Sequence, residues 1–291
     1  FVFMSATALK FLRTWLTVGT RRTDAGEENV DDVKMEVRLG AKTTSMVKAQ
    51  IAKQEEEDSR QLKFTPMDLS FIDLKYTVDV EETNEQSGKK EKYTRTLLAG
   101  INGYARAGEL TALMGSSGAG KTTLMDVLAG RKTEGKISGK ILVDGHPQEF
   151  PSFNRLMGYC QQEDIHLGTD TVREAIEFST RLRLPTSVSA ETRQAFVDQI
   201  LDDLELTPIA NRLIGDKNIE GLSPGQLKLV TIGVELAANP TFLFLDEPTS
   251  GLDSRAALIV CRVIRKIARR GRSVICTIHQ PSAELFYMFD R

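Results

Sequence analysis

Residues 115–122 read Gly-Ser-Ser-Gly-Ala-Gly-Lys-Thr, which fits the pattern G-x-x-x-x-G-K-[ST] of a phosphate-binding loop. The run 109–114 before it predicts a short buried strand, and the run 123–129 after it predicts a helix. This context lets successive N–H groups and a helix N-terminus point at an anion. We expect Lys121 to reach the β- and γ-phosphates of a nucleotide and Thr122 to bind Mg²⁺. The motif therefore predicts a nucleotide-binding α/β domain.

Composition limits the alternatives. The 291 residues are 41% hydrophobic and 27% charged, which suits one large globular domain or a domain with an inserted subdomain. The net charge of −2 lacks the basic excess of a nucleic-acid-binding domain, so we expect no nucleic-acid partner. The three cysteines form no C-x-x-C pair and the three histidines are scattered. A disulfide scaffold and a zinc site are both disfavoured, and a reducing compartment fits.

The first 63 residues differ from the rest. Residues 1–22 are largely apolar, are interrupted by Lys10 and Arg13, and contain no acidic residue. They hold no stretch of 18 uncharged apolar residues, so no complete membrane span is expected. Three interpretations remain open: the end of a membrane helix with a basic flank, an organelle transit peptide, or an ordinary amphipathic helix. Residues 23–63 are polar and predict a flexible charged linker.

From residue 64 onward the sequence predicts ordered structure, first mainly strands and then mainly helices. Strands are expected at 69–80, 97–104, 109–114 and 136–143, with a hairpin connection within 81–92. Thr171 and Glu174 form a capping-box pattern that opens one helix, and Ser189 caps a second helix, which Thr207 and Pro208 end. A buried strand is then expected at 241–245, a helix at 254–270 and a strand at 273–278.

Several polar residues follow the expected core strands, where ligands bind in open α/β sheets. Asp246 suits Mg²⁺ coordination, and Glu247 is placed to polarise the water that attacks the γ-phosphate. His279 follows the strand at 273–278 and is either a γ-phosphate ligand or a structural histidine. The pair Gln161–Gln162 follows residues 156–160 and can sense metal and attacking water.

A second anion site is expected at residues 222–226, Leu-Ser-Pro-Gly-Gln, which open a helix. It lies far from the phosphate-binding loop in sequence, which suggests that it caps a nucleotide held by another copy. The helix 254–270 carries a basic face that could touch a membrane or a partner. An ordinary surface helix with cations near its C-terminus is the favoured interpretation.

Taken together, the chain resembles the ATP-binding cassette of an ABC transporter over residues 64–291. The P-loop, Q-loop, signature, Walker B, D-loop and H-loop occur in the family order. The detailed sequence resembles subfamily G, the white/pleiotropic-drug-resistance type, in four segments: Thr171–Ala175, Thr231–Leu236, Asp246–Asp253 and His279–Ser282. The resemblance implies a P-loop NTPase of the α/β class. Its RecA-like core would have a mostly parallel sheet, an antiparallel β-subdomain and an inserted helical subdomain at about 165–236.

The resemblance also assigns roles by position. ATP would be held within the chain by Gly115, Ser116, Ser117, Gly118, Ala119, Gly120, Lys121, Thr122 and Thr123. Thr122, Gln162 and Asp246 would bind Mg²⁺. Glu247 would be the catalytic carboxylate, assisted by His279 and Gln162. Tyr76 is either an adenine-stacking residue or a core tyrosine.

Two such cassettes would close head-to-tail over two ATP molecules. The partner's nucleotide would then be contacted by Ser223, Gly225 and Gln226, and Asp253 of the D-loop would also contribute. The signature departs from the family at Pro224, where a glycine is usual, so one N–H donor is lost. A degraded signature resembles the second cassette of a full-size drug-resistance transporter.

The resemblance implies an ATPase that powers transport, and we expect export of lipids or hydrophobic compounds. A transmembrane domain absent from this chain would be the partner, with the cassette on the cytoplasmic face of the membrane. The alternatives are a soluble ABC ATPase without a transport role and an inactive nucleotide-binding fragment. The six apolar spans of a transporter would distinguish them.

Overall fold

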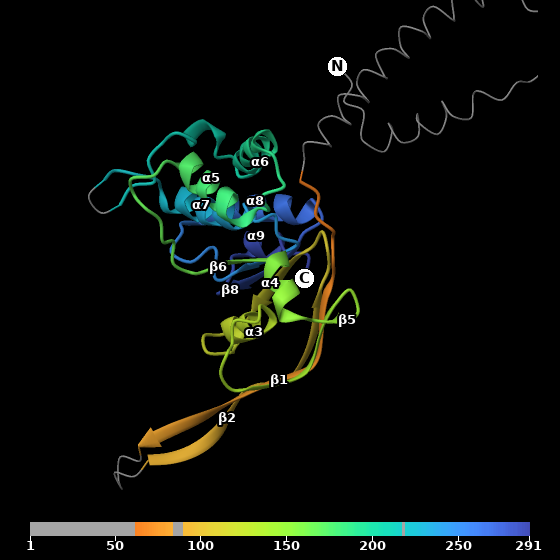
Figure 1. Cartoon of the computed structure of the whole chain (residues 1–291). Coiled ribbons are helices and arrows are strands. Elements are labelled where there is room, and N and C mark those ends of the chain that lie inside the picture. The colour runs from red at the N-terminus through yellow and green to blue at the C-terminus, as the bar shows by residue number, and fades with distance from the viewer. Residues whose placement is uncertain (1–61, 84–89, 217–218) are drawn as a thin grey trace, which may run out of the picture. The chain divides into compact units, whose positions relative to one another are not determined.

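The computed structural model describes residues 62–83, 90–216 and 219–291. All of them belong to one compact unit, Ser59–Arg291. The predicted stub 1–22 and all but the last two residues of the predicted linker 23–63 lie outside the described residues. Figure 1 shows two sheets with helices around them.

The first sheet is antiparallel and has the strand order β2-β1-β4-β5. Its strands are β1 Leu69–Thr83, β2 Lys90–Ala105, β4 Lys136–Val143 and β5 His146–Pro147. The register of β1 with β2 runs from Leu69↔Ala105 to Thr83↔Lys90, which confirms the predicted hairpin. Since β4 pairs with β1 only as far as Thr77, the outer part of the hairpin is a two-stranded ribbon extending away from the other elements (Figure 1).

The second sheet is parallel and has the order β3-β8-β7-β6. Its strands are β3 Leu110–Met114, β6 Met157–Cys160, β7 Phe242–Leu245 and β8 Ser273–Ile278. Every residue of β7 and β8 is buried, because helices or strands cover both faces. The apolar sequence predicted this correctly. All four carboxyl ends meet at one edge, which is where the candidate site lies.

Alternate residues of β7 face two different hydrophobic clusters. Phe242 and Phe244 pack with α3 (Lys121–Leu128), with β1, and with Phe153 of α4 (Phe150–Leu156). Leu243 and Leu245 pack with α8 (Ser254–Arg269) and with the helices of the region 172–236. The core sheet therefore has α3 on one face and α8 on the other.

Three helices form the middle of the chain and contact one another: α5 Val172–Arg183, α6 Ala190–Asp203 and α7 Pro224–Leu236. Figure 1 shows them grouped on one side of the parallel sheet. The predicted caps are confirmed, since Thr171 and Glu174 form a capping box and Ser189 caps α6. Helix α6 ends at Asp203, earlier than predicted, and a short 3₁₀ turn, η1 Thr207–Ile209, follows. The elements α4 and β5 and a short helix at residues 283–286 were not predicted.

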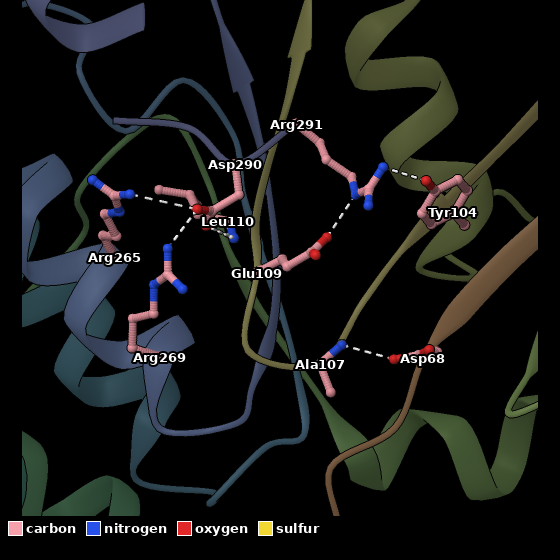
Figure 2. Close-up of polar contacts among 9 residues, drawn as sticks. All are labelled: Asp68, Tyr104, Ala107, Glu109, Leu110, Arg265, Arg269, Asp290 and Arg291. Carbon is pink, nitrogen blue, oxygen red and sulfur yellow. Dashed lines mark hydrogen bonds and ion pairs between the residues drawn. The ribbon is translucent and has the colours of Figure 1, made fainter. Parts of the chain in front are cut away.

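The basic face of α8 is neutralised within the chain. Arg262 pairs with Glu205, and Lys266 and Arg270 pair with Asp203. Arg265 and Arg269 pair with Asp290, which follows the short helix α9 (Ala283–Phe286) (Figure 2). These contacts support the ordinary surface helix rather than a membrane-binding face.

The last two residues fasten this end of the chain to β3. The backbone of Asp290 donates to the Leu110 carbonyl, and the Asp290 carboxylate accepts from the Leu110 N–H at 3.0 Å. Arg291 pairs with Glu109 at 2.6 Å and also contacts Tyr104 of β2 (Figure 2). One short segment thus ties the parallel sheet to both α8 and the antiparallel sheet.

Candidate functional site

The phosphate-binding loop joins the carboxyl end of β3 to the start of α3. Gly118 and Gly120 have positive φ angles of 77° and 88°, a region that glycine adopts without steric cost. The first N–H groups of any α-helix have no intrahelical partner, and no side chain caps α3. These donors are therefore available to an anion.

Lys121 adds positive charge to the same place. Its Nζ donates to the carbonyl oxygens of Gly115 and Ser116, both at 2.9 Å. These two bonds hold the ammonium group against the loop. The donors of the loop and the lysine ammonium group therefore lie together, in the arrangement that the motif predicts for an anion site.

Two carboxylates follow β7 at the same edge of the sheet. Asp246 Oδ1 accepts from the Thr122 hydroxyl at 3.1 Å, which joins the start of α3 to the end of β7. The backbone N–H of Asp246 donates to the Cys160 carbonyl at 2.9 Å. Asp246 and Thr122 thus present two oxygen atoms side by side, the ligand type that Mg²⁺ prefers.

A residue that sequence reasoning missed, Thr277 of β8, holds this pair in place. It is fully buried, and its hydroxyl donates to Asp246 Oδ1 at 2.7 Å and accepts from the Glu247 N–H at 2.8 Å. Glu247 has a φ of 46°, a conformation that is uncommon for residues other than glycine. The bond from its N–H to Thr277 therefore stabilises a strained backbone at the predicted catalytic residue.

The Glu247 side chain lies between two hollows. One, of about 240 Å³, is lined mainly by the phosphate-binding loop and the start of α3. The other, of about 440 Å³, is lined by Ser117, Glu247, His279 and residues 249–251. Gln162 Nε2 donates to Glu247 Oε2 at 3.2 Å. The structure therefore brings the predicted catalytic residues Glu247, His279 and Gln162 to the predicted phosphate site.

The signature residues form a different local structure. Ser223 caps α7, its hydroxyl accepts from the Gln226 N–H, and the Gln226 side chain accepts from the Ser223 N–H. Asp253 in the same way caps α8 through the Ala256 N–H at 2.9 Å. A Cβ added at Gly225 would lie 3.1 Å from the Ala256 Cβ, so the two helix starts are close neighbours. Ser223, Gly225, Gln226 and Asp253 line neither of the two hollows described above.

Comparison with known proteins agrees with this geometry. A protein-family profile described as ABC transporter matches residues 98–250. The chain is 51% identical over 229 residues to ABC transporter G family member 53 of Oryza sativa subsp. japonica, and these residues make up 79% of this chain and 16% of that protein. It is 50% identical over 230 residues to Pleiotropic drug resistance protein 1 of Nicotiana tabacum, with the same shares. The chain belongs to the ABC transporter family. The predicted resemblance to subfamily G and the P-loop NTPase fold are both confirmed.

The chain spans about 16% of the length of these relatives. Within residues 62–83, 90–216 and 219–291, no helix combines the length and the apolar character that crossing a bilayer requires. The matched region contains the phosphate-binding loop, the signature and the Walker B carboxylates. The structure therefore describes an ATP-binding cassette.

The residues of this ABC cassette fit ATP with Mg²⁺. The hollow at the loop is lined by Gly118, Gly120, Lys121 and Thr122, which offer backbone and ammonium donors for phosphate oxygens. The adjacent Thr122 and Asp246 oxygens suit a divalent ion that also binds phosphate. Gln162, the third predicted Mg²⁺ ligand, donates to Glu247 instead of lying against these two oxygens. Its metal role stays a prediction.

The structure supports the interpretation of Tyr76 as a core tyrosine. Its side chain is buried in the cluster beneath β1, and its hydroxyl donates to the Glu134 carbonyl at 2.9 Å. The ring therefore offers no open face for adenine stacking.

Pro224 occupies the first turn of α7, where a missing N–H removes no helical hydrogen bond.

A partly buried tyrosine connects the phosphate-loop helix to the Gln162 segment. Tyr159 of β6 donates to Asp126 of α3 at 2.8 Å, and Arg131 lies over its ring at 3.9 Å. Burial first, and then the bond to Asp126, raises the Tyr159 pKa far above its ordinary value, so the hydroxyl remains protonated. Burial also raises the pKa of the neighbouring Cys160 thiol, which makes it an unreactive core residue.

Proposed function

We propose that this chain is the ATP-hydrolysing cassette of a subfamily G transporter, and that hydrolysis drives export of lipids or other hydrophobic compounds across a membrane. The observation that carries the proposal is the meeting of Thr122, Asp246 and Glu247 beside the phosphate-binding loop. Gln162 donates a hydrogen bond to the Glu247 carboxylate, and His279 lines a hollow together with Glu247. Phosphate binding and water activation thus have separate residues at one site.

In the proposed reaction Glu247 accepts a proton from the attacking water. The water oxygen forms a bond to the γ-phosphorus while the bond from that phosphorus to the bridging oxygen breaks, leaving ADP and phosphate. Lys121 and the N–H groups of the loop stabilise the negative charge on the phosphate oxygens. Thr122 and Asp246 would hold Mg²⁺, which would supply further charge neutralisation. Gln162 orients the Glu247 carboxylate through its amide.

The proposed second partner is another cassette, placed head-to-tail. The capped start of α7, with Ser223, Gly225 and Gln226, is directed to a nucleotide that this chain's own loop does not hold. Its chemistry suits a phosphate through the positive end of the helix dipole, while Pro224 has no N–H and the Gln226 N–H is donated to the Ser223 hydroxyl. The arrangement supports one ATP between this signature and the partner's phosphate-binding loop.

The proposed membrane partner docks on exposed apolar residues of the helical region. Phe178 and Leu182 lie one turn apart on α5 and are 65% and 69% exposed. Ile165 and Leu167, on the segment after Gln162, are 79% and 69% exposed. Large apolar side chains in such numbers mark an interaction surface. A transmembrane domain bound to this surface places the cassette at the cytoplasmic face of a membrane. The membrane domain then lies close to the Gln162 segment of the cassette.

The names of the relatives, transporter and drug-resistance protein, support a transport role over the two alternatives of a soluble ABC ATPase or an inactive fragment. The Pro224 signature agrees with a second cassette of a full-size transporter. A membrane domain in the same transcript as this cassette would support this assignment.

The test is the substitution Glu247→Gln in the full-length transporter reconstituted in lipid vesicles. ATP binding, followed with a fluorescent analogue, remains within twofold of wild type, because Gln keeps the size and the phosphate loop is untouched. ATP hydrolysis falls at least a hundredfold. Glu284→Gln, which removes an exposed carboxylate on α9, is the matched control and keeps full activity. Wild-type hydrolysis by Glu247→Gln would refute the role of the site.

A further inference from the structure

A charged side chain lies buried between the signature helix and the Gln162 segment. Lys228 of α7 is only 2% exposed. Its Nζ donates to the backbone carbonyl of Gln162 at 2.9 Å and pairs with Asp164 Oδ1 at 2.8 Å. A buried ammonium group is costly unless it is paired and hydrogen-bonded. The two contacts provide that pairing, and both come from one short segment.

The same segment is held at a second point. Thr231, one turn after Lys228 on the same helix face, donates its hydroxyl to Asp164 Oδ1 at 2.6 Å. His166 Nε2 lies 2.8 Å from that hydroxyl oxygen. Since the single hydroxyl proton goes to Asp164, we assign the His166 Nε2–H as a donor to Thr231. Residues 162–166 are thus fixed to α7 through Lys228 and Thr231.

Each end of this connection leads to a different predicted ATP site. Helix α7 begins at its cap, Ser223, and a helix rises about 1.5 Å per residue. Along the helix axis Lys228 therefore lies about 7–8 Å from Ser223 and about 3–5 Å from Gly225 and Gln226, the residues proposed to meet the partner's nucleotide. At the other end, the Gln162 side chain donates to Glu247, the proposed base of this chain's own site.

We propose that Lys228 is a positioning residue for hydrolysis, which holds the Gln162 backbone so that the Gln162 amide meets Glu247. A shift of the α7 N-terminus on the partner's ATP then moves Gln162 at this chain's own ATP, because Lys228 and Asp164 connect the two. This inference rests on the proposed function. It adds a named contact through which one site affects the other.

The test uses the full-length transporter in lipid vesicles. Lys228→Met keeps an unbranched side chain of similar length and removes the charge. We expect kcat to fall about tenfold or more, as a small misplacement of a catalytic group does. The KM for ATP and the affinity for a fluorescent ATP analogue stay within twofold. Lys228→Arg, which retains the charge, keeps more of the activity than Lys228→Met.

A double-mutant cycle separates positioning from simple structural support. In a Gln162→Ala background, Lys228→Met lowers kcat by less than twofold, because the residue through which it acts is gone. An equal loss in both backgrounds would overturn the proposal.

A second variant addresses folding. Lys228→Met alone leaves the partly buried Asp164 carboxylate without its cation, so Lys228→Met/Asp164→Leu removes both charges. We expect its thermal midpoint to recover to near the wild-type value while kcat stays low. Recovery of kcat together with stability would show a purely structural pair. If the Glu247→Gln variant hydrolyses ATP normally, the proposed function fails. If hydrolysis requires Glu247 but is unchanged by the Lys228 substitutions, only this inference is refuted.

Discussion

Replacing Thr277 with valine keeps the shape of a fully buried side chain and removes its hydroxyl group. In the native chain this hydroxyl makes two bonds, one to Asp246 at 2.7 Å and one from the Glu247 N–H at 2.8 Å. Valine leaves the Glu247 N–H without this acceptor, at a residue whose φ of 46° is already strained. We therefore expect Thr277→Val to reduce both stability and activity.

The magnitude follows from the two bonds. A buried N–H left without a partner costs about 1–3 kcal/mol, and a hydrogen bond to a charged group is worth about 1.5–3 kcal/mol. Since Asp246 keeps Thr122 as a partner, the lower part of the second range applies. The total is about 3 kcal/mol. In a domain of this size that lowers the thermal midpoint by roughly 6–12 °C.

Thr277→Ser is the matched control, because it keeps both hydrogen bonds and removes one methyl group. It costs about 1 kcal/mol, or roughly 2–4 °C. Thermal unfolding of the wild type and both variants, followed by calorimetry, measures the difference. If Thr277→Val unfolds at the same temperature as Thr277→Ser or above it, the hydroxyl does not hold the carboxylates as argued.

Two further predictions concern a cap and a histidine. Asp253→Ala removes the N-cap of α8 and lowers the free energy of unfolding by about 1 kcal/mol, whereas Asp253→Asn, an equally good cap, preserves it. Urea unfolding measures the stability of both variants. Equal losses of stability in the two variants would contradict the capping role. Burial lowers the pKa of His166 from 6.5, since it outweighs the opposing charge of Asp164 and is reinforced by Lys228. The stability that neutral His166 contributes is thus complete above pH 6.5 and is lost as the pH falls through the lowered pKa. An NMR titration midpoint at or above 6.5 would contradict this.

Local signals predicted much of the fold. The capping box at Thr171 and the cap at Ser189 located two helices, and the apolar run before His279 located β8 with its bounds. Helix α4 was missed because no side chain caps it and only Phe153 among its residues is buried, so its sequence lacks an apolar stripe. The site residues that follow core strands were predicted because strand ends in a parallel sheet share one edge.

Contacts that depend on topology were not predictable. Thr277 reaches Asp246 because β8 lies beside β7, and nothing in the sequence near Thr277 specifies that neighbour. A polar residue near the end of an otherwise apolar strand was the available signal. Likewise, the burial of Lys228 depends on how α7 packs against the segment beginning at Gln162, and nothing in the sequence near Lys228 specifies that neighbour.

The position of β3 has a consequence for synthesis on the ribosome. Its sheet neighbour is β8, and Cys276 of β8 contacts Thr111 of β3 across 165 residues of sequence. At roughly 5–20 residues per second, translation takes on the order of 10–30 s to cover that separation. During this interval the nascent strand before the phosphate-binding loop has no strand to pair with. The nucleotide motif is therefore translated early and completed late, and a product released before β8 would carry the motif without the strand that pairs with β3.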